Sequence, residues 1–266
     1  MRHTKELFDL TGRVAIVTGG RGLYGASISL GLCEMGATVV IASRNGEKCE
    51  EYAKSLREQG YDAWGMALDL SDDDSIKTFT DAVYSRFGHI DILVNNAVDR
   101  QNMTSLQDAT RQKLRDSADV NLHGQILLSQ AVLEYMIPQN KGSIINISSM
   151  RGLDCPHFPF YPETWGDQPV TYTAEKWALV GLTKYMAGRY GKHGIRVNCI
   201  APGGYHPGLA DDPDKQAFQQ TYIDNCPLGC WANEDDIKGP VAFLASDASG
   251  YVTGATLVMD GGWTIW

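Results

Sequence analysis

The sequence has no apolar run that approaches the length of a membrane-spanning helix, and its first six residues lack the apolar stretch of a signal peptide. Its six cysteines include no repeated Cys-x-x-Cys, and Cys226 and Cys230 have no second pair or histidine at zinc-site spacing. Basic residues are also in the minority, because 23 lysines and arginines accompany 32 acidic residues and give a net charge of −9. We therefore expect a cytoplasmic protein with reduced thiols, no metal site and no nucleic-acid or membrane partner.

What the sequence does contain is a regular alternation of short apolar runs and longer helical patterns. The predicted strands are Val14–Thr18, Thr38–Ala42, Ala63–Leu68, Ile90–Asn95, Ser143–Ile147, Ile195–Ile200 and Thr256–Met259. They are nearly all apolar, as strands covered on both faces are. The predicted helices are Gly25–Met35, Glu47–Gln59, Ser71–Phe87 and Tyr172–Tyr190, with Ser71 as the N-cap of the third. This order predicts one α/β domain over residues 1–266, with a Rossmann-type, doubly wound parallel sheet of about seven strands flanked by helices.

A glycine-rich turn directly follows the first predicted strand. Gly20-x-Gly22-x-x-Gly25 also opens a helix, which is the context in which this spacing binds a dinucleotide. Glycines permit the tight turn and let the backbone approach the pyrophosphate, while the helix N-terminus offers free N–H groups to the phosphates. We expect the cofactor to contact Gly19, Arg21, Gly22, Leu23 and Gly25.

The end of the second strand bears on which dinucleotide is bound. An acidic residue there would accept hydrogen bonds from the adenosine ribose, but the chain has Ser43 and Arg44. A hydroxyl and a forked guanidinium suit a 2′-phosphate, and Arg21 could add a second cation. The sequence therefore favours NADP, with NAD as the alternative if Arg44 is merely an exposed residue before a helix.

Polar residues also end the next two strands. Asp69 and Leu70 follow the third strand and Asn95–Ala97 close the fourth. We expect Asp69, Leu70, Asn96 and Ala97 to contact the cofactor, although Asp and Asn at strand ends are also common turn residues.

Tyr172 and Lys176 lie four residues apart, so that on a helix they share one face. A lysine ammonium beside a phenol favours the phenolate, which makes a tyrosine usable as a general acid and base.

Together with these features, the chain resembles the compact, single-domain branch of the short-chain dehydrogenase/reductase family over essentially its whole length. The matching motifs are Thr18–Gly25, Asp69-Leu70, Asn95–Ala97, Val120–Leu122, Ile147–Ser149, Tyr172-x-x-x-Lys176, Pro202-Gly203 and Asp260–Gly262. The resemblance implies an oxidoreductase that interconverts a secondary alcohol and a ketone with NAD or NADP.

The resemblance also implies roles for individual residues. Tyr172 would exchange the proton with the substrate oxygen, and Ser149 would hold that oxygen. Lys176 would bind the nicotinamide ribose and favour the phenolate, and Asn121 would hold a water that links Lys176 to solvent. Ser148 would then cap backbone, and Pro202-Gly203 would lie against the nicotinamide.

Three departures from the family pattern stand out. The middle glycine of the turn, Gly22, comes one position early, with the length from Thr18 to Gly25 unchanged. Val98 replaces a glycine, and since a β-branched residue disfavours positive φ, the turn there is expected to differ. The threonine that usually follows Pro202-Gly203 is missing.

The family places two segments beside the substrate: a loop over residues 153–171 and a lid over residues 204–226. The loop is longer than usual by roughly ten residues and carries four aromatic side chains among prolines, carboxylates and amides. These suit a polyhydroxylated substrate, although the aromatics could instead bury themselves. His157, Trp165 and Tyr205 are the substrate candidates, and a looser similarity links the loop to members that act in flagellin modification and sugar metabolism.

The sequence thus predicts an NADP-preferring dehydrogenase of a sugar or polyol. A reductase of apolar ketones and a non-catalytic dinucleotide sensor are the alternatives. The resemblance also implies a homotetramer or homodimer. Because an apolar tail would be unusual if exposed, we expect Trp263–Trp266 to pack at a subunit interface.

Overall fold

The structure, a computed structural model, describes residues 1–207 and 213–265. Its seven strands form one sheet in the order β3-β2-β1-β4-β5-β6-β7, and every pairing is parallel. The strands are β1 Val14–Thr18, β2 Thr38–Ser43, β3 Ala63–Ala67, β4 Ile92–Asn95, β5 Gly142–Ile147, β6 Ile195–Pro202 and β7 Thr256–Met259. The predicted Rossmann-type sheet is confirmed, and all seven predicted strands are present with ends shifted by at most two residues.

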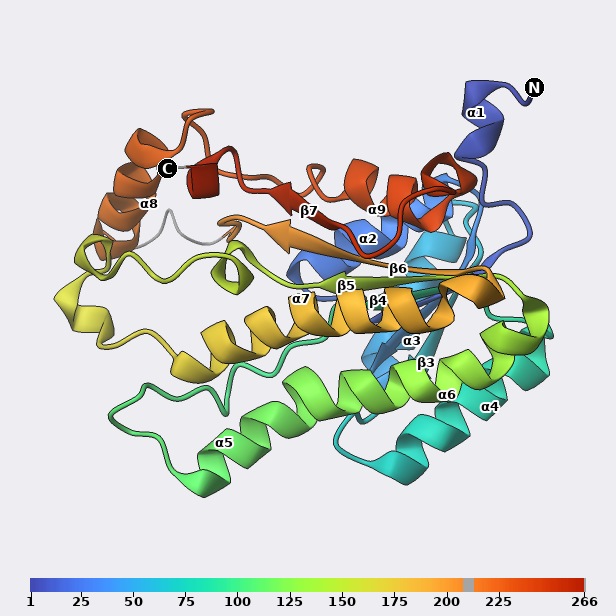
Figure 1. Cartoon of the computed structure of the whole chain (residues 1–266), viewed down its shortest axis with the longest axis horizontal. Coiled ribbons are helices and arrows are strands. Elements are labelled where there is room, and N and C mark those ends of the chain that lie inside the picture. The colour runs from blue at the N-terminus through green and yellow to red at the C-terminus, as the bar shows by residue number, and fades with distance from the viewer. Residues whose placement is uncertain (208–212, 266) are drawn as a thin grey trace.

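Helices cover both faces of the sheet, with α2 and α9 on one side and α4, α6 and α7 on the other (Figure 1). The helices of the described chain are α1 Thr4–Leu7, α2 Leu23–Glu34, α3 Gly46–Arg57, α4 Asp73–Phe87, α5 Arg111–Ala118, α6 Gly124–Gln139, α7 Val170–Tyr190, α8 Pro213–Asn225 and α9 Lys238–Ala245. No helix in these ranges combines the length and the apolar character needed to cross a membrane.

The two helical layers explain why the strands lack alternation between apolar and polar residues. In β1, Ala15 and Val17 pack on the side of α2, whereas Val14 and Ile16 pack on the side of α4 and α6. All five residues of β1 are buried, because successive side chains point to opposite faces and both faces are covered.

One predicted helix start is wrong. The N-cap of α4 is Asp72, whose carboxylate accepts a hydrogen bond from the amide of Asp74 at 3.0 Å. Ser71 cannot serve as the cap, because its amide and hydroxyl both donate to the carboxylate of Asp69, at 3.0 and 2.7 Å.

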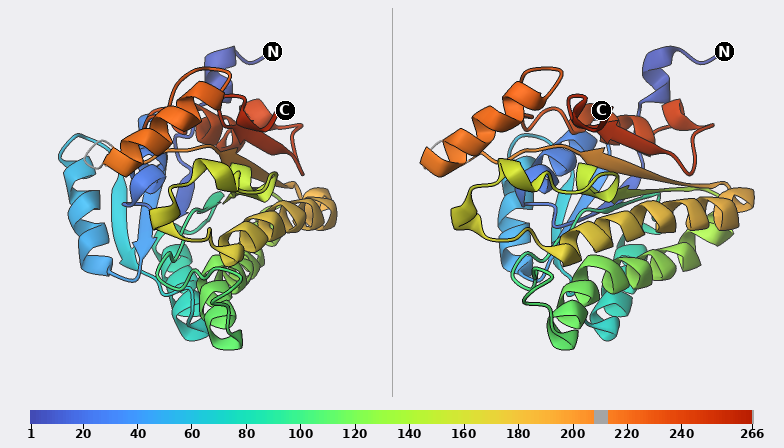
Figure 2. Two further views of the ribbon diagram at one scale, coloured as in Figure 1. Left: turned by 90° about the vertical axis from the view of Figure 1, so that its left-hand side faces the viewer. Right: turned by 60° about the vertical axis from the view of Figure 1, so that its left-hand side comes forward.

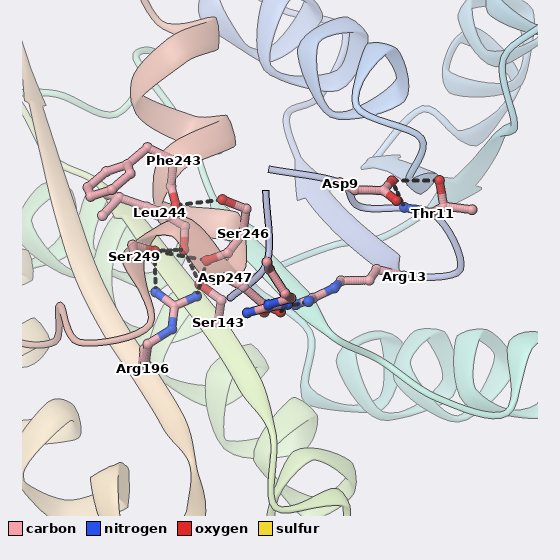
Figure 3. A network of polar contacts seen from close by, with 11 residues as sticks. Asp9, Thr11, Arg13, Ser143, Arg196, Phe243, Leu244, Ser246, Asp247 and Ser249 are labelled. Carbon is pink, nitrogen blue, oxygen red and sulfur yellow. Dashed lines mark hydrogen bonds and ion pairs between the residues drawn. The ribbon is translucent and has the colours of Figure 1, made fainter. Parts of the chain in front are cut away.

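A polar network holds the chain together at the amino ends of the strands (Figure 3). The guanidinium of Arg13, just before β1, pairs with Asp247 at 2.5 Å, and Arg2 pairs with the same carboxylate at 2.7 Å. Nearby, Arg196 in β6 donates to the hydroxyl of Ser249 at 2.6 Å. Partial burial acts to raise the pKa of Asp247, but the hydrogen bonds from the two arginines outweigh it and lower the pKa to about 2.

The opposite, carboxyl ends of the strands are covered by two segments. The loop between β5 and α7 (yellow) and helix α8 (orange) lie next to one another there in both figures (Figures 1 and 2). Ring contacts connect them, since Phe218 of α8 lies 5.0 Å from the rings of both Tyr161 and Trp165. These two segments therefore shape whatever site opens at this edge of the sheet.

Candidate active site

A cavity of about 850 Å³ opens at the carboxyl ends of β1, β4, β5 and β6. This edge of an open parallel sheet, where the strand order reverses, is where such folds bind ligands. Most of the residues that the sequence assigns to the cofactor and to catalysis line it together: Gly19, Arg21, Gly22, Leu23, Gly25, Ser43, Asn96, Ala97, Ser149, Tyr172, Lys176, Pro202 and Gly203.

The glycine turn is shaped by backbone geometry. Gly19 has φ +63°, a conformation that favours glycine, and a Cβ on Gly25 would lie 2.0 Å from the carbonyl oxygen of Gly19. Gly22 has φ −83° and no such clash, so that the backbone does not require glycine there. It caps α2 without a side-chain hydrogen bond, which leaves the helix N-terminus open towards the cavity.

The turn after β4 is fastened to the glycine turn by a residue that sequence reasoning did not single out. The hydroxyl of Thr18 accepts hydrogen bonds from the amides of Asn96 and Ala97, both at 3.0 Å. The side-chain amide of Asn96 donates in turn to the carbonyls of Thr18 and Gly19, at 2.9 and 3.3 Å. Asn96 thus supports the turn with its own side chain.

Val98, which replaces the family glycine, causes no strained turn. Among the described residues other than glycine, only Asn140 has a positive φ. Val98 is half-buried and contributes its side chain to the cavity wall. The chain therefore passes through this position without the positive φ that a β-branched residue disfavours.

A smaller hollow of about 150 Å³ adjoins the cavity and contains the residues expected at the adenosine end. Ser43, Arg44, Asp69 and Leu70 line it. Arg44 is exposed, and no acidic residue in the described part of the chain forms an ion pair with it. Burial acts to raise the pKa of Asp69, but the hydrogen bonds from Ser71 outweigh it and hold the pKa below its usual value.

Tyr172 and Lys176 share one face of α7, as their spacing predicts. The Lys176 ammonium lies 5.6 Å from the centroid of the Tyr172 ring and donates to the carbonyl of Ile147 at 2.8 Å. Lys176 is only 5% exposed, and this burial lowers the pKa of its ammonium to about 8. An ammonium with this pKa exchanges its proton far more readily near neutral pH than an exposed lysine does.

The two serines after β5 have different environments. The hydroxyl of Ser148 is buried and donates to the carbonyl of Lys176 at 2.7 Å, so that it ties β5 to α7. The Ser149 oxygen lines the cavity and accepts a hydrogen bond from the amide of Arg151 at 3.1 Å. Because that oxygen acts as acceptor towards Arg151, its own proton stays available to a ligand.

Asn121 does not line the cavity but lies behind it, in a π-helical turn over Asp119–His123. Its side-chain amide exchanges two hydrogen bonds with the backbone of Asp99 and donates to the carboxylate of Glu175 at 2.9 Å. Glu175, which the sequence did not single out, also accepts from the hydroxyl of Ser117 at 2.7 Å. Burial raises the pKa of Glu175 in spite of these hydrogen bonds.

The substrate candidates separate in the structure. Trp165 and Tyr205 line the cavity, and Tyr205 stacks on Tyr24 of the glycine turn with ring centroids 4.5 Å apart. His157 is exposed, lies against Phe160 and does not line the cavity. The loop aromatics thus do both things that the sequence left open, since some face the cavity and others pack within the chain.

The expected lid extends from residue 204 to residue 226, of which residues 208–212 lie outside the described structure. Tyr222 of α8 contacts the strand edge, and its hydroxyl accepts from the amide of Gly204 at 3.1 Å. A Cβ on Gly203 would lie 2.7 Å from that hydroxyl, which explains why a glycine follows Pro202.

The expectation that the tail packs on another subunit is wrong for Trp263. Its ring stacks on Tyr222 of the same chain, with centroids 4.2 Å apart and planes at 8°, and the residue is 7% exposed. Phe160 of the substrate loop meets its edge at 5.8 Å. Ile265 is 71% exposed, and Trp266 lies outside the described residues.

Known proteins resemble this chain over almost its whole length. A family model described as enoyl-(acyl carrier protein) reductase matches residues 22–264. The gluconate 5-dehydrogenase of Gluconobacter oxydans is 32% identical over 261 residues, which are 98% of this chain and 98% of that protein. The D-threitol dehydrogenase of Mycolicibacterium smegmatis is 35% identical over 265 residues, which are 97% of this chain and 95% of that protein.

The solved structures agree as well. The crystal structure of a gluconate 5-dehydrogenase from Burkholderia cenocepacia in complex with NADP and tartrate is similar with a TM-score of 0.89 at 34% identity. The similarity covers 99% of this chain and 100% of that one. Because these matches extend over almost the entire length of each protein, the chain belongs to the short-chain dehydrogenase/reductase family and is an NAD(P)-dependent oxidoreductase that interconverts a secondary alcohol and a ketone.

Proposed function

We propose that this enzyme acts on a secondary hydroxyl of a sugar or polyol and prefers NADP to NAD. The observation that carries the proposal is that Ser149, Tyr172 and Lys176 line the same cavity as the glycine turn. The relatives described above act, by their names, on gluconate and threitol, both of which are chains of neighbouring hydroxyls.

The residues present fit a dinucleotide. The missing side chains of Gly19, Gly22 and Gly25 leave a cradle beside the open N-terminus of α2, and this combination suits a pyrophosphate. Arg44 at the adenosine end, with no acidic partner in the described chain, suits a 2′-phosphate better than a ribose hydroxyl. Pro202 and Gly203 form the wall where the nicotinamide would lie.

The bound nicotinamide supplies the hydride acceptor for oxidation and the hydride donor for reduction. In the oxidation direction, the Tyr172 phenolate removes the proton from the substrate hydroxyl as the carbonyl forms. Ser149 donates a hydrogen bond to the same oxygen and fixes its place. General acid–base catalysis of this kind is worth about 10²- to 10⁴-fold in rate.

Lys176 places a positive charge beside Tyr172, because its ammonium lies 5.6 Å from the centroid of the tyrosine ring on the same face of α7. The carbonyl of Ile147 keeps the ammonium in place. We propose that Asn121 acts from behind, by fixing the π-helical turn and the water that connects Lys176 to solvent.

Two segments enclose the proposed substrate site. Residues 153–171 form the substrate loop and residues 204–226 the lid, with Trp165 and Tyr205 in contact with substrate.

We further propose that the enzyme is a cytoplasmic homotetramer or homodimer. Sedimentation at micromolar concentration tests the assembly, and a monomer there contradicts it.

The first experiment follows the absorbance of the reduced nicotinamide with NADP and with NAD against sugars, polyols and simple secondary alcohols. Reduction of NADP by a polyhydroxylated compound is the expected result. Turnover of apolar alcohols alone would favour the reductase of apolar ketones, and turnover with NAD alone would contradict the role of Arg44.

The Tyr172→Phe variant separates an enzyme from a cofactor sensor. We expect turnover to fall by about 10³-fold or more, since the proton carrier is gone. Cofactor affinity, followed by fluorescence titration, should stay within about threefold, because Tyr172 contributes little to pyrophosphate and adenosine binding. A variant with full turnover would rule out the assigned mechanism.

A further inference from the structure

The cavity is lined by cations in a protein whose net charge is −9. Five lysines and arginines contribute to its wall, and none of the described lining residues is an aspartate or a glutamate: Arg21, Arg100, Arg151, Lys176 and Lys215. In the proposed function, the phosphates and ribose of the cofactor account for Arg21 and Lys176. Among the other cations, Arg100 is exposed whereas Arg151 is buried, and a buried cation in a substrate cavity points to a negative charge on the substrate.

Arg151 is the most unusual of these cations. It is only 6% exposed, although arginines are almost never buried unless they are paired. Its guanidinium donates to the carbonyl of Cys155 at 2.6 Å and to the hydroxyl of Tyr161 at 3.1 Å, and both acceptors are neutral. No carboxylate of the described chain lies within ion-pair distance of it.

A buried charge without a counter-charge destabilises a folded protein. The ring of Trp263, with its centroid 5.9 Å from the guanidinium carbon, offsets only part of this cost. A ligand that brings a carboxylate would complete the site, because guanidinium and carboxylate match each other's fork of hydrogen bonds.

Arg151 also lies at the reacting end of the cavity. It is two residues from Ser149, and its amide donates to the Ser149 hydroxyl oxygen at 3.1 Å. Its side chain reaches Tyr161 of the substrate loop, so that it spans the region between the oxygen-holding serine and the loop. A group bound by Arg151 therefore belongs to the substrate and is remote from the adenosine hollow around Arg44.

We propose that Arg151 binds the carboxylate of the substrate, so that the enzyme acts on a sugar acid in preference to the neutral polyol of the same chain length. This inference rests on the proposed sugar or polyol activity and adds the charge of the substrate to it. The names of the relatives include both classes, since gluconate is an acid and threitol is neutral. The buried guanidinium is what favours the acid.

The test compares gluconate with glucitol, which differs at the carboxylate carbon, in the presence of NADP. We expect the wild type to give the higher kcat/KM with gluconate. In Arg151→Met, which keeps an apolar stem of similar length, kcat/KM for gluconate should fall by about 10- to 100-fold. The value for glucitol should stay within about threefold.

Two matched variants sharpen the result. Arg100→Met removes an exposed cation from the same cavity wall, and it should affect the two compounds alike. Arg151→Lys retains the charge without the fork and should give an intermediate value for gluconate. It also serves as the test variant if Arg151→Met does not fold, as judged by circular dichroism and cofactor affinity.

A binding measurement keeps this inference distinct from the proposed function. Calorimetric titration of gluconate into the complex with NADP should give binding that Arg151→Met loses and Arg100→Met retains, whether or not turnover follows. Turnover of glucitol without that of gluconate would leave the proposed function intact and overturn the role of Arg151. Equal gluconate binding by wild type and Arg151→Met would overturn it as well.

Discussion

The side-chain amide of Asn121 donates a hydrogen bond to the buried carboxylate of Glu175 at 2.9 Å, directly behind the active site. Glu175 precedes Lys176 in α7, and Asn121 belongs to the π-helical turn that ends before α6. The contact thus joins α7, which carries Tyr172 and Lys176, to α5 and α6, which the π-helical turn connects. Glu175 is a positioning residue, since it does not line the cavity.

The first prediction is that Glu175→Gln weakens this joint. The two oxygens of Glu175 accept from Ser117 and Asn121, and a glutamine would present a donor to one of them. We expect the free energy of unfolding to fall by about 1–2 kcal/mol, measured by urea denaturation. The exposed Glu134→Gln on α6 is the control and should match the wild type.

The same variant has a readout that a purely structural role would not change. The charge of Glu175 raises the pKa of Lys176 against the larger, lowering effect of burial. Without that charge the pKa of Lys176 should fall below its value of about 8. The lysine-dependent limb of the pH profile of kcat/KM should therefore move to lower pH. An unchanged profile would show that Glu175 acts on packing alone.

The second prediction distinguishes Ser148 from Ser149. Ser149→Ala should lower kcat by about 10²- to 10³-fold, because the substrate oxygen loses a donor. Ser148→Ala should instead leave kcat within about threefold and lower the free energy of unfolding by about 1–2 kcal/mol, because the Lys176 carbonyl loses its buried donor. Steady-state kinetics and denaturation of both variants check this, and a reversal of the two effects would exchange the assigned roles.

The third prediction concerns the choice of cofactor. Arg44→Ala should lower kcat/KM for NADP by about 10- to 100-fold, since a charged hydrogen bond to the 2′-phosphate is lost. The value for NAD should be nearly unchanged. Arg21→Ala in the glycine turn is the comparison: equal weakening of both cofactors would assign Arg21 to the pyrophosphate, and a loss with NADP alone would make it the second cation at the 2′-phosphate. Equal loss with Arg44→Ala would remove the argument for NADP.

The fourth prediction tests the network at the amino ends of the strands. The pKa of Asp247 is lowered to about 2, so its charge stabilises the fold above its ordinary pKa, and that contribution is lost as the pH falls from 4 towards 2. Asp247→Asn should cost about 1 kcal/mol at pH 7, a value reduced for solvent screening of a side chain that is 30% exposed.

Thermal unfolding between pH 5 and pH 3 provides the measurement for this variant. The difference between wild type and Asp247→Asn should shrink towards pH 3. Asp235→Asn, whose carboxylate is 72% exposed in its pair with Lys238, is the control and should change little. A difference that grows on acidification would have the wrong sign and contradict the assignment.

The sequence was sufficient for the sheet and for most of the cofactor and catalytic candidates that line the cavity, although Asn121 and His157 lie outside its wall. Strands such as β1 are predictable because burial on both faces demands an unbroken apolar run. The glycine turn is predictable because Gly19 and Gly25 meet a local constraint that other residues cannot satisfy. Both signals lie within a few neighbouring residues of the chain.

The remaining features depend on residues far apart in the chain. Nothing near Trp263 indicates that Tyr222 and Phe160 cover it, so an apolar tail suggested a subunit interface. Glu175 has the pattern of an ordinary helical glutamate until Ser117 and Asn121 are brought against it. The Ser71 cap, by contrast, was wrong for a local reason, because Asp69, two residues earlier in the chain, competes for its hydroxyl.

The cationic wall within an acidic protein has a consequence for how ligands arrive. At physiological ionic strength a charge is felt over about 8 Å, so an approaching anion first meets the repulsive field of the whole molecule and only later that of the cavity. Added salt screens both, but the outer repulsion governs the rate of encounter and the inner attraction governs retention. Association and residence time of an anionic substrate should therefore respond to salt in opposite directions.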